Sequence, residues 1–246
     1  MSIEAIFHAL IACHIVTGAV GLAAFWIPVA GPKGGRIHRL GGTVFTATMM
    51  TTGTFAIGIS ICTLLAPVET HPHLMSHPDF GSVQSISAIF GWMMIYLAIL
   101  TVNLAWYGWL CIRNKRNRKA CRTPLNLALQ GILIVAAANC AIQGVMIGMG
   151  LMVGMSLVGF ATAGTNLYYL YKPTPGRVEW LAEHIKALVG AGISVYTAFF
   201  AFGAVRLLPE AALTPALWAA PLIVGLGLIL YHRRAVTQPI RAKATR

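Results

Sequence analysis

The chain has 246 residues, of which 57% are hydrophobic and only 10% are charged. Soluble domains carry about 25% charged residues, so this chain lacks the polar surface that a water-soluble fold needs. Its formal net charge of +12 lies in short segments between apolar runs. That distribution argues against nucleic-acid binding and is typical of a protein whose loops set its orientation in a membrane. We therefore expect one integral membrane domain, residues 1–246, with the lipid bilayer as its partner.

Several apolar runs are long enough to cross a hydrocarbon core of about 30 Å, which takes about 20 helical residues. The first run follows Glu4, where a secretory signal would be basic, and is interpreted as an uncleaved span. The run from Leu125 to Tyr171 contains no charge. As one helix it would be about 70 Å long, so it must hold two spans that turn near Gly148 to Gly150. The sequence predicts an all-α polytopic transmembrane helical bundle of seven spans: 6–29, 40–66, 83–112, two within 125–171, 180–205 and 216–231.

Two local patterns refine these spans. The third run ends in Trp106, Tyr107 and Trp109, which predicts an aromatic belt at a membrane interface. Thr174 followed by Pro175 favours a helix start at that point, with threonine as the N-cap and proline at the first helical position.

Basic residues assign each connecting segment to one side of the membrane. All but one of the 18 Lys and Arg residues lie in four segments: 33–39, 113–122, 172–186 and 233–246. The segments that alternate with these carry one basic residue and four acids: Arg206, Glu4, Glu69, Asp79 and Glu210. Because cytoplasmic loops are enriched in Lys and Arg, we expect the N-terminus outside and the C-terminus in the cytoplasm.

The sequence contains no nucleophile motif, phosphate-binding loop or metalloprotease helix, so its histidines and cysteines are the main candidates for chemistry. His14 lies near the middle of the first span, where an imidazole needs a partner or a ligand. A hydrogen bond to Thr17 or to a neighbouring helix fits as well as a functional role. The cysteines are odd in number, form no C-x-x-C, and mostly lie in apolar runs, which argues against a disulfide framework.

One external loop gathers His71, His73 and His77 with Met75 and Asp79. Imidazole, thioether and carboxylate ligands suit copper or zinc, so the loop is a candidate metal site. The short spacing and the prolines of the loop fit a solvated connection equally well.

The turn from Gly31 to Gly42 joins the first two spans and carries His38 and Arg39. His184 opens the sixth span on the same side. Both histidines fit interfacial residues that bond headgroups or loop carbonyls. They also fit a pair of axial haem ligands, because a membrane haem b needs two imidazoles on facing helices, small residues beside its ring and cations for its propionates. The small residues would be Gly41, Gly42, Gly190 and Gly192.

Three short motifs carry a family resemblance: His14-x-x-x-Gly18, Lys33-Gly34-Gly35-x-x-His38-Arg39-x-x-Gly42, and Glu183-His184. They resemble a family of uncharacterised bacterial multi-pass membrane proteins, known as a domain of unknown function. That family is distantly similar in layout to the b-type di-haem membrane cytochromes. The resemblance implies a helical bundle in the bacterial inner membrane and a haem. A second haem of the cytochrome kind would have to use His8, His14 or the loop histidines.

Three functions follow as expectations. The first is electron transfer through one b-type haem, linked to quinol, with His38, His184 and Arg39 in the cofactor site and His14 as a further candidate. The second is transport of a small solute, with or without coupling to protons. The third is a scaffold or assembly protein without chemistry of its own. A haem spectrum separates the first from the others.

Overall fold

The structure, a computed structural model, describes residues 2–77, 81–203 and 215–244, and these residues are helical apart from short connections. Seven segments are long and apolar enough to cross a membrane. The prediction of an all-α bundle with seven apolar segments of spanning length is confirmed. In chain order the elements are α1 (Ile3–Ala30), α2 (Arg36–Leu65), α3 (Pro67–Thr70), η1 (Pro72–Leu74), α4 (Val83–Ile86), η2 (Ser87–Met93), α5 (Met94–Asn114), η3 (Arg118–Cys121), α6 (Pro124–Met146), α7 (Gly150–Tyr171), α8 (Glu179–Ala198), η4 (Phe199–Gly203) and α9 (Pro215–Ala244).

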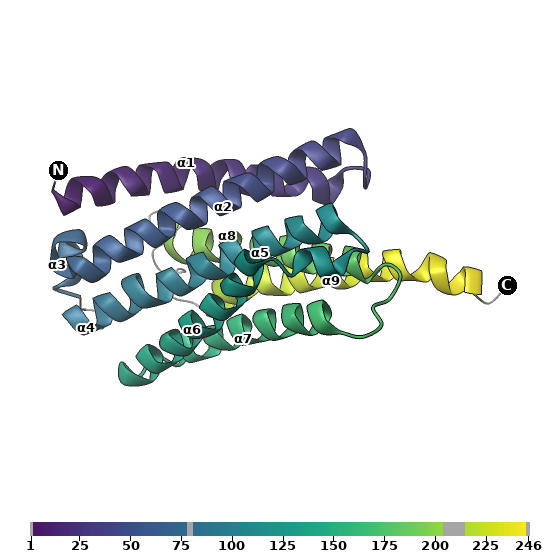
Figure 1. The fold of residues 1–246 in the computed structure, drawn as a ribbon. Helices are drawn as coiled ribbons and strands as arrows, with labels where there is room; N and C mark the ends of the chain where they lie inside the picture. Colours follow the sequence, from purple (N-terminus) through teal and green to yellow (C-terminus); the bar gives the residue numbers. More distant parts are fainter. Residues whose placement is uncertain (1, 78–80, 204–214, 245–246) are drawn as a thin grey trace.

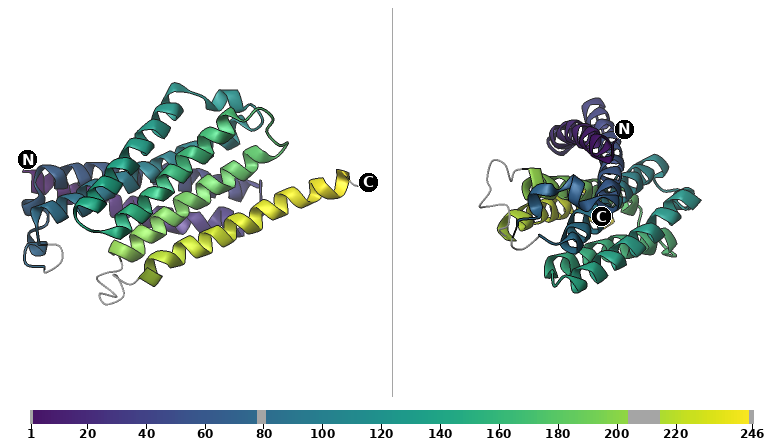
Figure 2. Two further views of the ribbon diagram at one scale, coloured as in Figure 1. Left: turned by 90° about the horizontal axis from the view of Figure 1, so that it is seen from below. Right: turned by 90° about the vertical axis from the view of Figure 1, so that its left-hand side faces the viewer.

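Helix α5 is the centre of the bundle. It packs against α2, α6 and α8, and the apolar span Val83–Asn114, to which it belongs, is buried to a larger extent than any other span. The pairs α1–α2, α6–α7 and α8–α9 lie around it (Figures 1 and 2). The two ends of the bundle differ in the segments that they carry. We call the end with the α1–α2 turn, the α5–α6 connection and the start of α8 the basic end, and the end with α3, η1 and α4 the histidine-loop end (Figure 1).

The reversal between α6 and α7 lies where the sequence predicts it. Helix α6 ends at Met146 and α7 begins at Gly150. Gly148 adopts a φ of +69°, a conformation that glycine reaches without a steric penalty. The Gly148–Gly150 turn is therefore confirmed.

The sixth span begins one residue before its predicted start at residue 180, but the predicted helix start at Thr174 and Pro175 is wrong. Helix α8 begins at Glu179 and not near Thr174. The Glu179 carboxylate accepts the backbone N–H of Gly176 at 2.6 Å and the Lys172 ammonium at 2.9 Å. In the first turn itself, the N–H groups of Glu179 and Leu181 donate to the loop carbonyls of Gly176 and Val178 at 3.1 and 2.9 Å, so the preceding residues stay outside the helix.

Glycines let α5 approach its neighbours closely. A Cβ at Gly53 on α2 would lie 2.6 Å from the Val102 side chain, and one at Gly108 on α5 would lie 2.8 Å from the Leu188 side chain. Small residues at helix contacts are typical of membrane bundles, where close backbone approach replaces the hydrophobic effect as the source of packing energy.

Candidate functional site

His38 is held by the backbone carbonyl of Pro28, which accepts no hydrogen bond within its own helix α1. In a continuous helix the Pro28 carbonyl would accept the N–H of residue 32, but Pro32 has none. His38 Nδ1 lies 3.1 Å from this oxygen, and Lys33 Nζ lies 2.8 Å from it. Because a carbonyl oxygen only accepts, the Nδ1 atom of a neutral His38 carries the proton. Its Nε2 atom therefore keeps a lone pair.

His184 is positioned in the same way by a different helix. Its Nδ1 atom lies 2.9 Å from the carbonyl oxygen of Gly108 on α5. Gly108 makes this possible, since a side chain there would meet Leu188 and hold α8 away. His184 thus also donates through Nδ1 and keeps the Nε2 lone pair.

The basic end brings His38 and His184 near one another. They are close enough for their charges to interact, and His232 on α9 interacts with His38 and Lys33 in the same manner. Arg39 is exposed one residue after His38. Within residues 2–77, 81–203 and 215–244, no three His, Cys, Asp or Glu side chains are placed to hold a metal ion. This end therefore carries two imidazoles on different helices, His38 on α2 and His184 on α8.

His38 and His184 are suitable ligands for a b-type haem, but two of the glycines predicted to make room for its ring do not do so. Two Nε2 lone pairs from different helices, each with Nδ1–H on a backbone carbonyl, form the ligand set that bis-imidazole haem requires. However, a Cβ at Gly192 would lie 2.3 Å from the Phe25 ring, and one at Gly41 would lie 2.5 Å from Ile27. The prediction that these two glycines leave room for the ring is wrong, because they serve helix contacts. Gly42 has no atom within 4 Å of that position.

His14 lies away from this pair. Its Nδ1 atom is 3.1 Å from the carbonyl oxygen of Thr52 on α2, and the Thr52 hydroxyl donates to Thr17 at 2.9 Å. Of the alternatives left open by the sequence, the structure shows a hydrogen bond to a neighbouring helix. Since His14 precedes Pro28 by about 20 Å along α1, it does not share the site of His38.

At the histidine-loop end, His71 is part of an aromatic cluster. Its ring lies between Phe7 and Phe90, with centroid distances of 5.5 and 4.8 Å. Burial, with a smaller contribution from the His73 charge, lowers the pKa of His71 to about 4. Asp79 lies outside the described residues. Among the described residues, no three His, Cys, Asp or Glu side chains are placed to hold a metal ion, so the candidate metal site of His71, His73 and His77 stays a prediction.

Tyr107 belongs to a buried polar cluster and not to the predicted aromatic belt. Its hydroxyl donates to Glu183 Oε2 at 2.9 Å, and its side chain is fully buried. Lys186 donates to the same carboxylate oxygen at 2.5 Å and to the Thr165 hydroxyl at 3.2 Å. An acid and a base in one span that pair three residues apart are the sequence signal for this cluster.

A layer of buried amides continues from this cluster into the bundle. Asn166 on α7 donates to Gln130 on α6 at 3.2 Å and to Asn103 on α5 at 3.4 Å. Asn126 donates to the backbone carbonyl of Cys121 at 2.8 Å. All four amide side chains are fully buried. The layer ties α5, α6 and α7 together by hydrogen bonds that have no competition from water.

Comparisons of the chain with protein families, with curated proteins and with solved structures found no match. The length and hydropathy of seven helices define the chain as a multi-pass helical membrane protein. The geometry of the basic end is therefore the feature that indicates a function.

Proposed function

We propose that this chain is an electron-transfer protein of the bacterial inner membrane that binds one b-type haem through His38 and His184. The observation that supports the proposal is the matched state of the two imidazoles. Each donates Nδ1–H to the carbonyl of another helix, Pro28 on α1 and Gly108 on α5, and each keeps a lone pair on Nε2. A backbone carbonyl behind a ligating imidazole fixes its orientation and raises its basicity.

The chain's own residues divide the work at this site. His38 and His184 would hold the iron from two helices, and their backbone partners would keep both rings from turning. Arg39 and Lys33 lie in the turn beside His38 and would neutralise the propionates. When bound, the haem would supply one-electron chemistry. A membrane quinol is the electron partner that we propose, because it shares the bilayer with the protein.

A second candidate function is transport of a small polar solute or of protons. It is favoured by the partly buried Glu183–Lys186 pair and by the buried amide layer, since ionisable and polar groups inside a membrane span often mark a pathway. This function requires no haem, so a spectrum of the protein distinguishes it from the first.

The test is the reduced-minus-oxidised absorbance spectrum of the purified full chain, produced in cells with ample haem. We expect a b-type spectrum with one haem per chain. His38→Ala and His184→Ala should each lose it, because one remaining imidazole binds haem weakly. His73→Ala, which alters an exposed histidine at the opposite end, is the matched control and should keep it. A colourless wild-type protein, or full haem content in His184→Ala, would contradict the proposal.

A further inference from the structure

Two cysteines lie close together at the basic end, where α5 ends and η3 follows it. Cys111 lies in the last turn of α5 and Cys121 is the last residue of η3, and each is 1% exposed. The chain turns back between them at Lys115, whose φ of +49° is rare for a residue other than glycine. This turn packs Cys121 against the end of α5, where its thiol donates to the carbonyl of Leu110, the neighbour of Cys111, at 3.6 Å. The other three cysteines are also free thiols, and only Cys13 among the five is exposed.

The surroundings of the pair make the Cys121 thiol lose its proton more easily than the Cys111 thiol. Cys121 Sγ accepts from the Cys111 thiol and from the Asn114 side-chain amide, which lies 3.4 Å away. These donors stabilise the thiolate and, against the effect of burial, lower the pKa of Cys121 to about 7. Thiolates, rather than thiols, are the nucleophiles of thiol–disulfide exchange. Cys121 is therefore the sulfur that would attack a disulfide first. Cys111 is the thiol that would then attack the resulting mixed disulfide.

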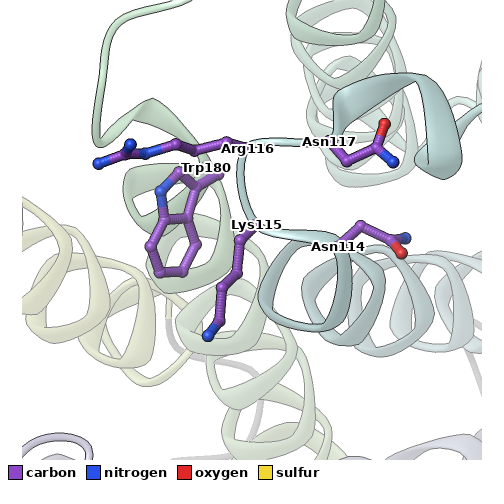
Figure 3. Close-up of a pocket in the computed structure, with 5 residues that line it drawn as sticks. All are labelled: Asn114, Lys115, Arg116, Asn117 and Trp180. Carbon is purple, nitrogen blue, oxygen red and sulfur yellow. The ribbon is translucent and has the colours of Figure 1, made fainter.

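A positively charged cleft lies next to Cys121. It has a volume of about 450 Å³ and is lined by Asn114, Lys115, Arg116, Asn117 and Trp180 (Figure 3). A neighbouring cleft of about 280 Å³ shares Arg116 and Trp180 and adds Arg177. The nearby Glu179 carboxylate is already paired with Lys172. The Asn114 side chain, which lines the first cleft, also donates to the Cys121 sulfur and so links the cleft to the buried thiol pair.

We propose that Cys111 and Cys121 form a reversible dithiol–disulfide couple that exchanges with a small, negatively charged disulfide docked in the cleft of Lys115, Arg116 and Trp180. The Cys121 thiolate attacks one sulfur of the small disulfide, whose S–S bond breaks, and one half leaves as a thiolate. The Cys111 sulfur then attacks Cys121 Sγ. The mixed disulfide breaks, and the second half leaves with the proton of Cys111. The protein dithiol loses two electrons and the small disulfide is reduced to two thiols.

This couple does not rest on the proposed haem, because its residues on α5, η3 and the start of α8 include neither His38 nor His184. Glutathione disulfide is the probe for the test. The purified full chain is incubated with it, the remaining thiols are blocked, and the peptides are mapped without reduction. We expect a Cys111–Cys121 disulfide in the wild type. Cys111→Ser should stop at a glutathione adduct on Cys121, since the second thiol is missing.

The charge of the probe tests the cleft with the wild-type protein alone. Glutathione disulfide should oxidise the pair roughly tenfold faster than the neutral 2-hydroxyethyl disulfide at low salt, because a basic cleft concentrates anions. Lys115→Gln with Arg116→Gln should remove most of that difference by slowing the reaction with glutathione disulfide. Adducts on Cys13 with Cys111 and Cys121 still reduced would overturn the couple. Equal rates with both reagents in the wild type would overturn the docking site.

Discussion

The pairing of Pro28 and Pro32 shows how a single missing N–H can place a histidine. The free carbonyl of Pro28 accepts from His38 and Lys33, and this fixes the tautomer of the imidazole. From the sequence, a position near a helix end could be predicted for His38. The carbonyl that holds it could not, because a motif does not show which neighbouring helix supplies an acceptor.

The ring of His71 leads to a prediction about pH. Its pKa of about 4 in the folded protein is below the value of about 6.5 expected for the unfolded chain. The neutral His71 ring therefore stabilises the folded protein fully above pH 6.5, and this stabilisation is lost as the pH falls from 6.5 towards 4. The loss should be on the order of 3 kcal/mol over that window.

The measurement is the free energy of unfolding in detergent at pH 7 and at pH 4.5. His71→Phe keeps an aromatic ring between Phe7 and Phe90 but cannot take up a proton, so its stability should fall clearly less than that of the wild type. His73→Ala controls for a nearby exposed imidazole and should keep most of the fall. An equal loss in the wild type and in His71→Phe would show that His71 does not titrate in this way.

Among the elements, the spans were predictable and their contacts were not. Uninterrupted hydropathy identifies helices such as α6 and α7, and Gly148 identifies the turn between them. Hydropathy does not show which side of a helix faces protein, so Tyr107 was predicted for the interface although it is buried against Glu183. The π-helical segment η2, which carries Phe90 towards His71, gives no signal in the apolar pattern.

The contact between α5 and α8 depends on Gly108. We expect Gly108→Val to push α8 away from α5, because its Cβ would lie 2.8 Å from Leu188. The cost should be about 1–3 kcal/mol in unfolding free energy. If the proposed function is right, haem content should fall as well, since His184 loses its carbonyl partner.

Gly131→Val is the matched control, because Gly131 on α6 has no atom within 4 Å of the added Cβ. Unfolding in detergent and haem content are measured for both variants. A Gly108→Val protein as stable as the Gly131→Val protein would show that the close approach of α5 and α8 is not required.

At the scale of the whole molecule, charge predicts orientation. Four basic segments lie towards one end, while the α3–η1 connection lies at the other (Figure 1). At the basic end, the Arg113 and Arg122 guanidinium groups lie 4.8 and 4.5 Å from the ring centroids of Trp109 and Tyr171. Aromatic rings with cations are typical of a membrane interface. We therefore predict that the basic end faces the cytoplasm.

Reporter fusions test the orientation. A fusion after Arg118 should report the cytoplasm and a fusion after Pro72 the opposite side. A fusion after Gly148, in the α6–α7 turn, should agree with Pro72. Two reports from the same side at Arg118 and Pro72 would contradict the seven-span topology.

The most direct test of the proposed function is a ligand exchange at His184. The near-infrared magnetic circular dichroism of the oxidised, purified chain reports the axial ligands of a low-spin ferric haem. We predict the band of bis-imidazole ligation in the wild type. In His184→Met the band should shift to that of imidazole–thioether ligation, with a higher reduction potential. The absence of a low-spin haem signal, or a band that is the same in His184→Met as in the wild type, would contradict the assignment of His38 and His184 as the ligands.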